Sequence, residues 1–191
     1  MARACEAAGG WLPFDDFMAM ALYTPGLGYY ANGRVTFGRM PGGQSTQVPS
    51  APPATGALQT PGELPGSDFV TAPELSPLFG DVLARQVVQA LQATGTREVW
   101  EFGAGSGALA YQILKHIVQL EKATSTVFID KYVIVDLSGT LRARQQDRLR
   151  KWAGRVQWAD ALPDALNGVV LGNEVLDAMP VKLLARVDGQ W

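Results

Sequence analysis

Residues 97–109, REVWEFGAGSGAL, predict the fold of this chain more strongly than any other stretch. A short apolar run ends in the acid Glu101, and helix-forming residues follow a turn that carries Gly103, Gly105 and Gly107. This order is typical of a buried strand, a tight turn and a helix. Glycines let the backbone turn sharply and let a ligand approach closely. Glu101 would stand at the carboxyl end of the strand, where open α/β sheets bind their ligands.

The turn alone leaves the class of ligand open. The start of a helix after a glycine turn normally favours a phosphate, but the carboxylate of Glu101 also suits a ligand that carries positive charge. The spacing of the glycines, with Ala108 in the last position, also satisfies the dinucleotide-binding fingerprint. Spacing therefore allows either a nucleotide-type ligand or a turn that is only structural.

Composition narrows the possible classes of protein. The chain has 191 residues, of which 47% are hydrophobic, so it can bury a real core. A net charge of −2 without a basic run argues against a nucleic-acid partner. The single cysteine, Cys5, and the single histidine, His116, argue against the common metal clusters, and we expect no metal. No signal pattern or membrane-length apolar run is visible, so we expect no membrane insertion.

Three segments are expected along the chain. Residues 1–37 form an N-terminal helical segment, with apolar residues at helical spacing from Phe14 to Leu22. This helix would either pack on the main body or serve as a lid over a substrate pocket. Residues 38–67 are predicted to be a flexible insertion, because twelve of these thirty residues are Gly or Pro. Residues 68–191 form the main α/β domain.

The main domain is expected to open with an amphipathic helix. Thr71 and Glu74 stand three residues apart, as in a capping box, and Pro73 suits an early helical position. An apolar stripe then continues the helix to Thr94. Glu74 is either a cap carboxylate or a ligand contact, and the sequence does not choose between these roles.

Two later helices carry polar residues that we expect to be solvated. The helix of residues 108–122 places His116 one position off its apolar face. The helix of residues 138–152 is rich in arginine, and a charge run of this kind usually forms a solvated face without a function. Its arginines are Arg142, Arg144, Arg148 and Arg150.

Strands alternate with these helices, which predicts a doubly wound, mostly parallel sheet of the α/β class. After the first strand, further strands are expected over residues 132–137, 156–158, 168–172 and, as the start of another, 181–187. In a parallel sheet all carboxyl ends lie on one edge, where a ligand would bind. Polar residues occupy four of these ends, namely Glu101, Asp136, Asp160 and Asn173 with Glu174.

Asp136 ends the second strand, and an acid there can accept hydrogen bonds from both ribose hydroxyls of an adenosine. The 29 residues between Gly107 and Asp136 exceed the usual spacing of about twenty. Because a glycine turn follows the preceding strand, ligand binding nevertheless explains Asp136 better than a structural role does.

With these residues in place, the chain resembles the class I S-adenosylmethionine-dependent methyltransferases. More closely, it resembles the mitochondrial complex I assembly methyltransferases and their bacterial MidA-type relatives. The matching stretches are FMAMALYTPGLGYY at 17–30, GSDFVTAPELSPLFG at 66–80, EFGAGSGALA at 101–110, IVDLSGTLRARQ at 134–145 and GNEVLDAMPV at 172–181. The resemblance implies a Rossmann-like sheet with more strands than are visible here, so we expect a chain truncated at its C-terminus.

The resemblance also implies roles for the residues at the sheet edge. Glu101 and the glycine turn would hold the methionine end of the cofactor, Asp136 its ribose and Asp160 its adenine amino group. Relatives usually carry Glu at the position of Asp136. The remaining expected cofactor contacts are Thr71, Glu74, Leu137 and Ala161.

Asn173 and Glu174 would face the reactive methyl group, and Glu174 with Asp177 would clamp an acceptor guanidinium. Paired carboxylates can hold a guanidinium through two parallel hydrogen bonds. A structural alternative is that Asn173 and Asp177 only support a helix start.

The expected function is methylation of an arginine on a subunit of respiratory complex I, with S-adenosylhomocysteine as product. One alternative is an inactive assembly factor that binds a subunit without chemistry. Another is an NAD(P)-dependent oxidoreductase, although Glu101 and the Asn173–Glu174 pair are not usual features of hydride transfer. We expect a protein substrate, with a homodimer possible, in a bacterial cytoplasm or, for a eukaryotic chain, in the mitochondrial matrix.

Overall fold

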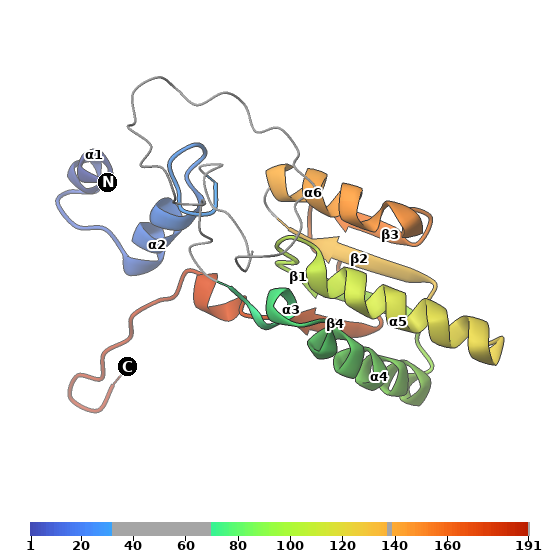
Figure 1. Cartoon of the computed structure of the whole chain (residues 1–191). Coiled ribbons are helices and arrows are strands. Elements are labelled where there is room, and N and C mark those ends of the chain that lie inside the picture. Colours follow the sequence, from blue (N-terminus) through green and yellow to red (C-terminus); the bar gives the residue numbers. More distant parts are fainter. Residues whose placement is uncertain (32–69, 137–138, 191) are drawn as a thin grey trace, which may run out of the picture.

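A parallel sheet lies at the centre of the computed structural model, which describes residues 1–31, 70–136 and 139–190 (Figure 1). The strands are β1 (Glu98–Phe102), β2 (Lys131–Val135), β3 (Val156–Ala159) and β4 (Val169–Gly172). The helices are α1 (Ala2–Ala7), α2 (Phe14–Tyr23), α3 (Ala72–Leu75), α4 (Pro77–Thr94), α5 (Ala108–Thr124) and α6 (Gly139–Leu149), with 3₁₀ turns η1 (Arg150–Trp152) and η2 (Leu176–Ala178). The expected insertion at 38–67 and the expected contact Leu137 lie outside the described residues.

The strand order is β3-β2-β1-β4, and every pair of neighbours is parallel. Trp100 in the middle of β1 lies opposite Val133 of β2 and Val170 of β4. The chain moves outward from β1 through β2 to β3 and then returns to the other side of β1. In such sheets the point where the order reverses is where ligands bind, at the carboxyl ends of the strands. The predicted parallel α/β fold is confirmed, and the reversal lies between β1 and β4.

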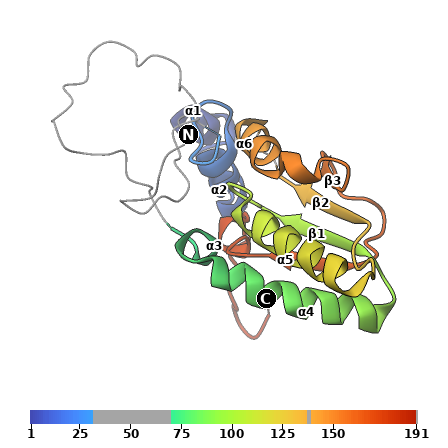
Figure 2. The same cartoon turned by 45° about the vertical axis from the view of Figure 1, so that its right-hand side comes forward.

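Helices α4, α5 and α6 lie side by side across one face of the sheet (Figures 1 and 2). Helix α5 is the central one, and its inner face is the predicted apolar stripe. Leu109, Ile113, Leu114 and Ile117 are at most 3% exposed. Each such side chain stabilises the fold by about 1.5–3 kcal/mol relative to an exposed position.

The helix expected from Thr71 to Thr94 is interrupted at Ser76. Ser76 has an extended backbone because the following Pro77 disfavours a helical conformation in the residue before it. Its hydroxyl then accepts a hydrogen bond from the amide of Leu78 at 3.2 Å and caps α4. Thr71 is the N-cap residue of the short α3, but its side chain makes no capping hydrogen bond. The predicted capping box is therefore wrong.

Two further expectations about local structure are wrong. Residues 181–187 form no strand, and in the described part of this segment only an isolated antiparallel bridge joins Val187 to Gln190. Among the described residues, no neighbouring strand pairs with this segment through backbone hydrogen bonds. His116 is half-buried instead of solvated, because α4 passes beside it and brings Asp81 within 3.8 Å of its Nδ1.

Candidate functional site

The glycine turn has the sharp geometry that the sequence predicts. Gly103, Gly105 and Gly107 have φ angles of 60°, 55° and 77°, in the left-handed region that favours glycine. A Cβ on Gly103 would lie 3.1 Å from Cγ2 of Val175, and one on Gly107 would lie 3.4 Å from Cγ of Gln145. The turn is thus enclosed between the loop after β4 and helix α6, and a side chain at Gly103 would crowd Val175.

Glu101 is buried next to this turn, with 2% of its surface exposed. Its Oε2 accepts a hydrogen bond of 2.6 Å from the hydroxyl of Tyr132. The pKa of Glu101 is raised to about 7, mainly by burial; the hydrogen bond from Tyr132 lowers it in part, and the charge of Asp136 raises it. A cationic ligand group placed here would stabilise the ionised carboxylate. Sequence reasoning found Glu101 but missed Tyr132, which lies inside the apolar run of β2.

Asp136, directly after β2, is held by a residue that sequence reasoning missed. The side-chain amide of Gln145 donates hydrogen bonds of 2.9 Å to Asp136 Oδ2 and to the carbonyl of Gly105. Its oxygen accepts from the indole of Trp158 at 2.9 Å, and Gln145 itself is completely buried. One amide therefore joins the ends of β2 and β3 to the glycine turn. The sequence did not single out Gln145, because Gln146 beside it is the same residue type.

The turn is also joined to α3 and α6 through Ser106. The Ser106 hydroxyl donates to a carboxylate oxygen of Glu74. Arg148 Nη1 donates to Ser106 Oγ at 2.6 Å and lies 3.5 Å from Glu74 Oε1. Glu74 is thus no helix cap, and it contacts the turn instead. The expectation that the Arg148 side chain is only solvated is wrong, because α6 passes over the turn.

Asp160 and Ala161, which follow β3, are both exposed. The Asp160 side chain is 83% exposed, and its Oδ1 lies 2.5 Å from Arg142 Nη2. Arg142 is therefore a second arginine of α6 that pairs with an acid at the sheet edge, contrary to the expectation of a solvated face. The expected contact of Asp160 with an adenine stays a prediction.

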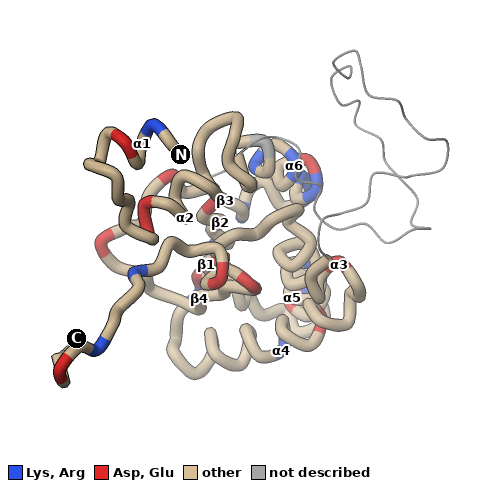
Figure 3. Tube along the Cα trace, turned by 90° about the vertical axis from the view of Figure 1, so that its left-hand side faces the viewer, with Lys and Arg blue, Asp and Glu red and all other residues tan. Residues whose placement is uncertain are grey.

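The loop after β4 carries the expected catalytic residues. Asn173 is half-buried, whereas Glu174 and Asp177 are exposed. Glu174 has a φ of 53°, a conformation that costs a side-chain-bearing residue about 1 kcal/mol or more. Val175 packs on Gly103 and Gly172, which fixes this loop against the turn. Figure 3 looks onto this edge and shows acidic positions near β1 and β4 and basic positions on α6.

Helix α2 lies beyond the carboxyl ends of the strands (Figure 1). The Tyr23 hydroxyl donates a hydrogen bond of 2.5 Å to the carbonyl of Ala178 in η2. The N-terminal segment therefore contacts the loop that carries Glu174 and Asp177. Both expected roles, packing and covering a pocket, are compatible with this position.

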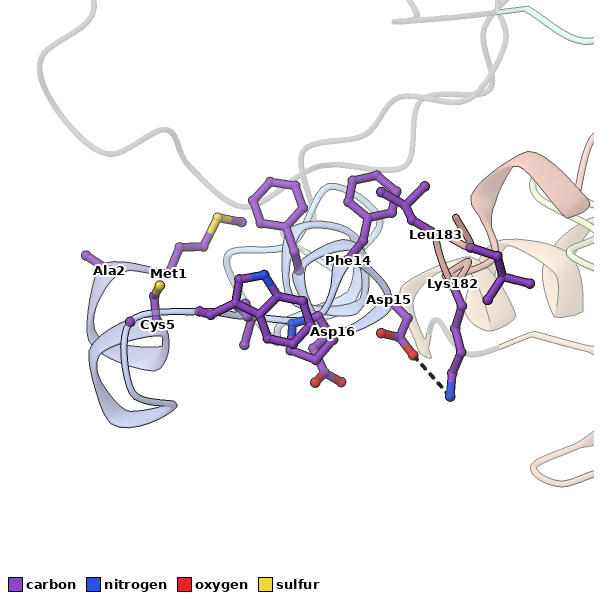
Figure 4. Close-up of a pocket in the computed structure, with 14 residues that line it drawn as sticks. Met1, Ala2, Cys5, Phe14, Asp15, Asp16, Lys182 and Leu183 are labelled. Carbon is purple, nitrogen blue, oxygen red and sulfur yellow. Dashed lines mark ion pairs between the residues drawn. The ribbon is translucent and has the colours of Figure 1, made fainter. Parts of the chain in front are cut away.

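A separate groove of about 980 Å³ lies between the N-terminal segment and residues 182–184 (Figure 4). Apolar side chains such as Trp11, Phe14 and Leu183 line it, and Asp15 Oδ2 lies 4.0 Å from Lys182 Nζ across it. None of the expected site residues lines this groove, so we place the candidate site at the sheet edge.

Among the described residues, no group of three His, Cys, Asp or Glu side chains is placed to hold a metal ion. In the same part of the chain, no helix combines the length and apolar character needed to cross a membrane.

Comparisons with known proteins agree with this geometry. A family model described as "Putative S-adenosyl-L-methionine-dependent methyltransferase" matches residues 82–191. A Burkholderia thailandensis protein described as a "likely methyl transferase", solved with bound S-adenosyl-homocysteine, is 49% identical with a TM-score of 0.73. The match covers 93% of this chain and 40% of that one.

Two curated relatives carry the name protein arginine methyltransferase NDUFAF7, with the qualifier mitochondrial. The Drosophila melanogaster homolog is 27% identical and the Danio rerio protein 24% identical. The matches cover 99% and 96% of this chain. They cover 42% and 43% of the relatives, so the chain spans about two fifths of their length.

The fold is that of an S-adenosylmethionine-dependent methyltransferase. Because the family model matches more than half of the chain, the chain belongs to the S-adenosylmethionine-dependent methyltransferase family that this model describes. The residues present fit the cofactor, since a buried carboxylate and a turn with three glycines stand together at the sheet edge.

Proposed function

We propose that this chain binds S-adenosylmethionine at the carboxyl ends of β1 and β2 and contributes to methyl transfer onto an arginine of a protein. The observation that carries the proposal is that Gln145 hydrogen-bonds both the glycine turn and Asp136, while the buried Glu101 lies close enough to Asp136 for its pKa to be raised by that charge. The names of the curated relatives support arginine as the acceptor.

In this proposal each acidic residue has a separate role. Glu101 binds the ammonium group of the cofactor, Asp136 accepts hydrogen bonds from the ribose hydroxyls, and Asp160 faces the adenine amino group. Thr71, Glu74 and Ala161 line the same cofactor site. When bound, the cofactor supplies a methyl group on a positively charged sulfur.

The loop after β4 would hold the acceptor. Glu174 and Asp177 accept N–H groups of the guanidinium and orient one nitrogen toward the methyl group, with Asn173 beside them. The new N–CH₃ bond replaces the S–CH₃ bond, and one proton leaves the guanidinium toward Glu174, which is exposed to solvent. Positioning for in-line displacement supplies much of the rate in reactions of this kind.

The proposal extends to the acceptor protein and the place of action. The acceptor is an arginine on a subunit of respiratory complex I, in line with the family that the sequence motifs resemble. Methylation then takes place in the cytoplasm of a bacterium or in the mitochondrial matrix of a eukaryote. A homodimer is the proposed assembly.

Calorimetric titration with S-adenosylmethionine and S-adenosylhomocysteine tests the cofactor site. Asp136→Ala should weaken both by about 10- to 100-fold, because a charged hydrogen-bond acceptor is worth about 1.5–3 kcal/mol. Asp130→Ala is the matched control, since Asp130 is an exposed acid just before β2, at its opposite end, and pairs with Arg97. NADH should not bind.

Three outcomes would contradict the proposal in different ways. Binding of NADH in place of the methyl donor would favour an oxidoreductase. Cofactor binding without methylation of arginine peptides would favour an assembly factor without chemistry. Equal effects of the Asp136 and Asp130 variants would show that the cofactor does not bind at the carboxyl ends of the strands.

A further inference from the structure

A cluster of three tyrosines, Tyr23, Tyr29 and Tyr30, stands at the sheet edge without a role in the cofactor site. The rings of Tyr23 and Tyr30 are stacked, with centroids 5.9 Å apart and planes at 26°. Tyr29 meets Tyr30 edge to face at 5.0 Å. The stacked pair and its edge-on neighbour form one aromatic surface.

The backbone builds this tyrosine cluster independently of any ligand. After α2 the chain turns back, and the amides of Tyr29 and Tyr30 each donate a 2.9 Å hydrogen bond to carbonyls of α2. Gly28 permits the turn, because a Cβ there would lie 2.5 Å from the amide nitrogen of Thr24. The rings therefore keep their relative positions before a substrate arrives.

The tyrosine cluster is attached to the loop that carries the proposed acceptor clamp. The Tyr23 hydroxyl binds the carbonyl of Ala178, a residue adjacent to Asp177. Burial, followed by the charge of Asp177, raises the pKa of Tyr30. Burial and then the charges of Tyr30, Asp136 and Asp177 raise the pKa of Tyr23. Carboxylates after both β2 and β4 thus lie near the tyrosine cluster.

Aromatic faces beside carboxylates recognise flat cations. A guanidinium stacks on an aromatic ring and donates hydrogen bonds in its own plane, whereas an ammonium is a compact, strongly hydrated charge. We propose that Tyr23 and Tyr30 form the aromatic wall of the acceptor site, on which the guanidinium of a substrate arginine stacks while Asp177 accepts its N–H groups. This inference rests on the proposed function and assigns substrate recognition to the N-terminal segment.

The test uses the chain saturated with S-adenosylhomocysteine and the probe N-acetyl-arginine methylamide, with the lysine analogue for comparison. Tyr30→Leu should weaken arginine-probe binding by about 3- to 30-fold, the range of a cation–π contact. Tyr30→Phe keeps the ring and should retain binding. Tyr111→Leu, on α5 and packed against Trp152, is the control for loss of a tyrosine elsewhere.

A second measurement needs no substitution. In ring-labelled protein, the arginine probe should shift the NMR resonances of Tyr23 and Tyr30 and leave those of Tyr111 in place. Affinity for S-adenosylhomocysteine should stay within about twofold in both Tyr30 variants.

The outcomes separate this inference from the proposed function. If S-adenosylhomocysteine binds but the arginine probe neither binds nor shifts the rings, the aromatic wall is refuted and the cofactor site stands. If Tyr30→Leu weakens S-adenosylmethionine but not its product, the rings face the sulfonium, which also refutes the inference. Failure of S-adenosylhomocysteine to bind overturns both proposals.

Discussion

Glu101 stands in an environment that favours its protonated form. In the unfolded chain the Glu101 carboxyl has its ordinary pKa near 4.5, whereas in the folded chain its pKa is about 7. Between these values the folded state keeps a proton that the unfolded state has released. Stability therefore falls as the pH rises through this window, because ionised Glu101 is buried.

We predict that Glu101→Gln removes this pH dependence. The variant and the original chain should have similar stability near the lower pKa, and the variant should be more stable at pH 8, by a difference on the order of 3 kcal/mol. Urea unfolding across this pH range measures it. Glu98→Gln on the same strand is the control, since Glu98 is half-buried and pairs with Lys131 at 2.9 Å. A constant offset at all pH values would contradict the prediction.

A second prediction concerns the left-handed backbone of the turn. Gly103→Ala should destabilise the chain by more than the about 1–2 kcal/mol that this conformation costs, because the new Cβ also meets Val175. It should also weaken binding of S-adenosylhomocysteine. Gly95→Ala, with a φ of 66° and open space around it, should show only the conformational cost and normal binding. Equal losses in both variants would show that the crowding has no effect.

Helix α6 affects the site through its arginines as well as its packing. Arg148 reaches Ser106 and Glu74, so α3, the glycine turn and α6 share one polar contact. We predict that Arg148→Ala weakens cofactor binding several-fold with little loss of stability, since partly exposed ion pairs contribute about 0–1 kcal/mol. Arg144→Ala, on the same helix and exposed, should leave binding unchanged. Calorimetry with S-adenosylhomocysteine measures the affinity of each variant. Equal affinities would show that Arg148 does not contribute to cofactor binding.

Gln112 joins three helices at once. From α5, its Nε2 donates to the carbonyl of Pro73 at 2.7 Å, and its Oε1 accepts from the amide of Gly80 at 3.1 Å. Gln112→Ala should lower stability by about 1–3 kcal/mol for each backbone group left unpaired. Gln119→Ala, two turns further along the exposed side of α5, should cost little. Thermal unfolding compares them, and similar melting temperatures would contradict this role of Gln112.

The surface of the whole molecule carries large exposed apolar side chains near its C-terminal end. Leu176 is 79% exposed, and Leu183 and Leu184 are each 72% exposed. Exposed apolar groups of this kind promote association, and β4 also lies at an edge of the described sheet.

We predict that the chain self-associates with increasing concentration. Replacing Leu183 and Leu184 by Ser should weaken association by about tenfold or more, because burying a leucine contributes about 1.5–3 kcal/mol. Sedimentation velocity measures the change. Leu162→Ser, with 62% exposure after β3, is the control. A monomer at all concentrations would contradict both this prediction and the proposed homodimer.

Much of the architecture could be predicted because its signals are local. The apolar stripe of α5, the buried runs of β1 and β2 and the glycines of the turn each reflect neighbouring residues along the chain. The acids at strand ends were also predictable, since parallel strands bring their carboxyl ends to one edge. The break at Ser76 also had a local signal, because this serine precedes a proline. The apolar stripe favoured one continuous helix over that signal.

The polar connections of the site had no local signal. Gln145 reaches Gly105, 40 residues away, Arg148 reaches Ser106, 42 residues away, and Tyr23 reaches Ala178, 155 residues away. Periodicity predicts which face of a helix is buried, but not which distant atom its polar side chains meet. Those partners depend on how the helices pack across the sheet, so only the folded chain brings Glu101 to Tyr132 and the tyrosine cluster to the loop after β4.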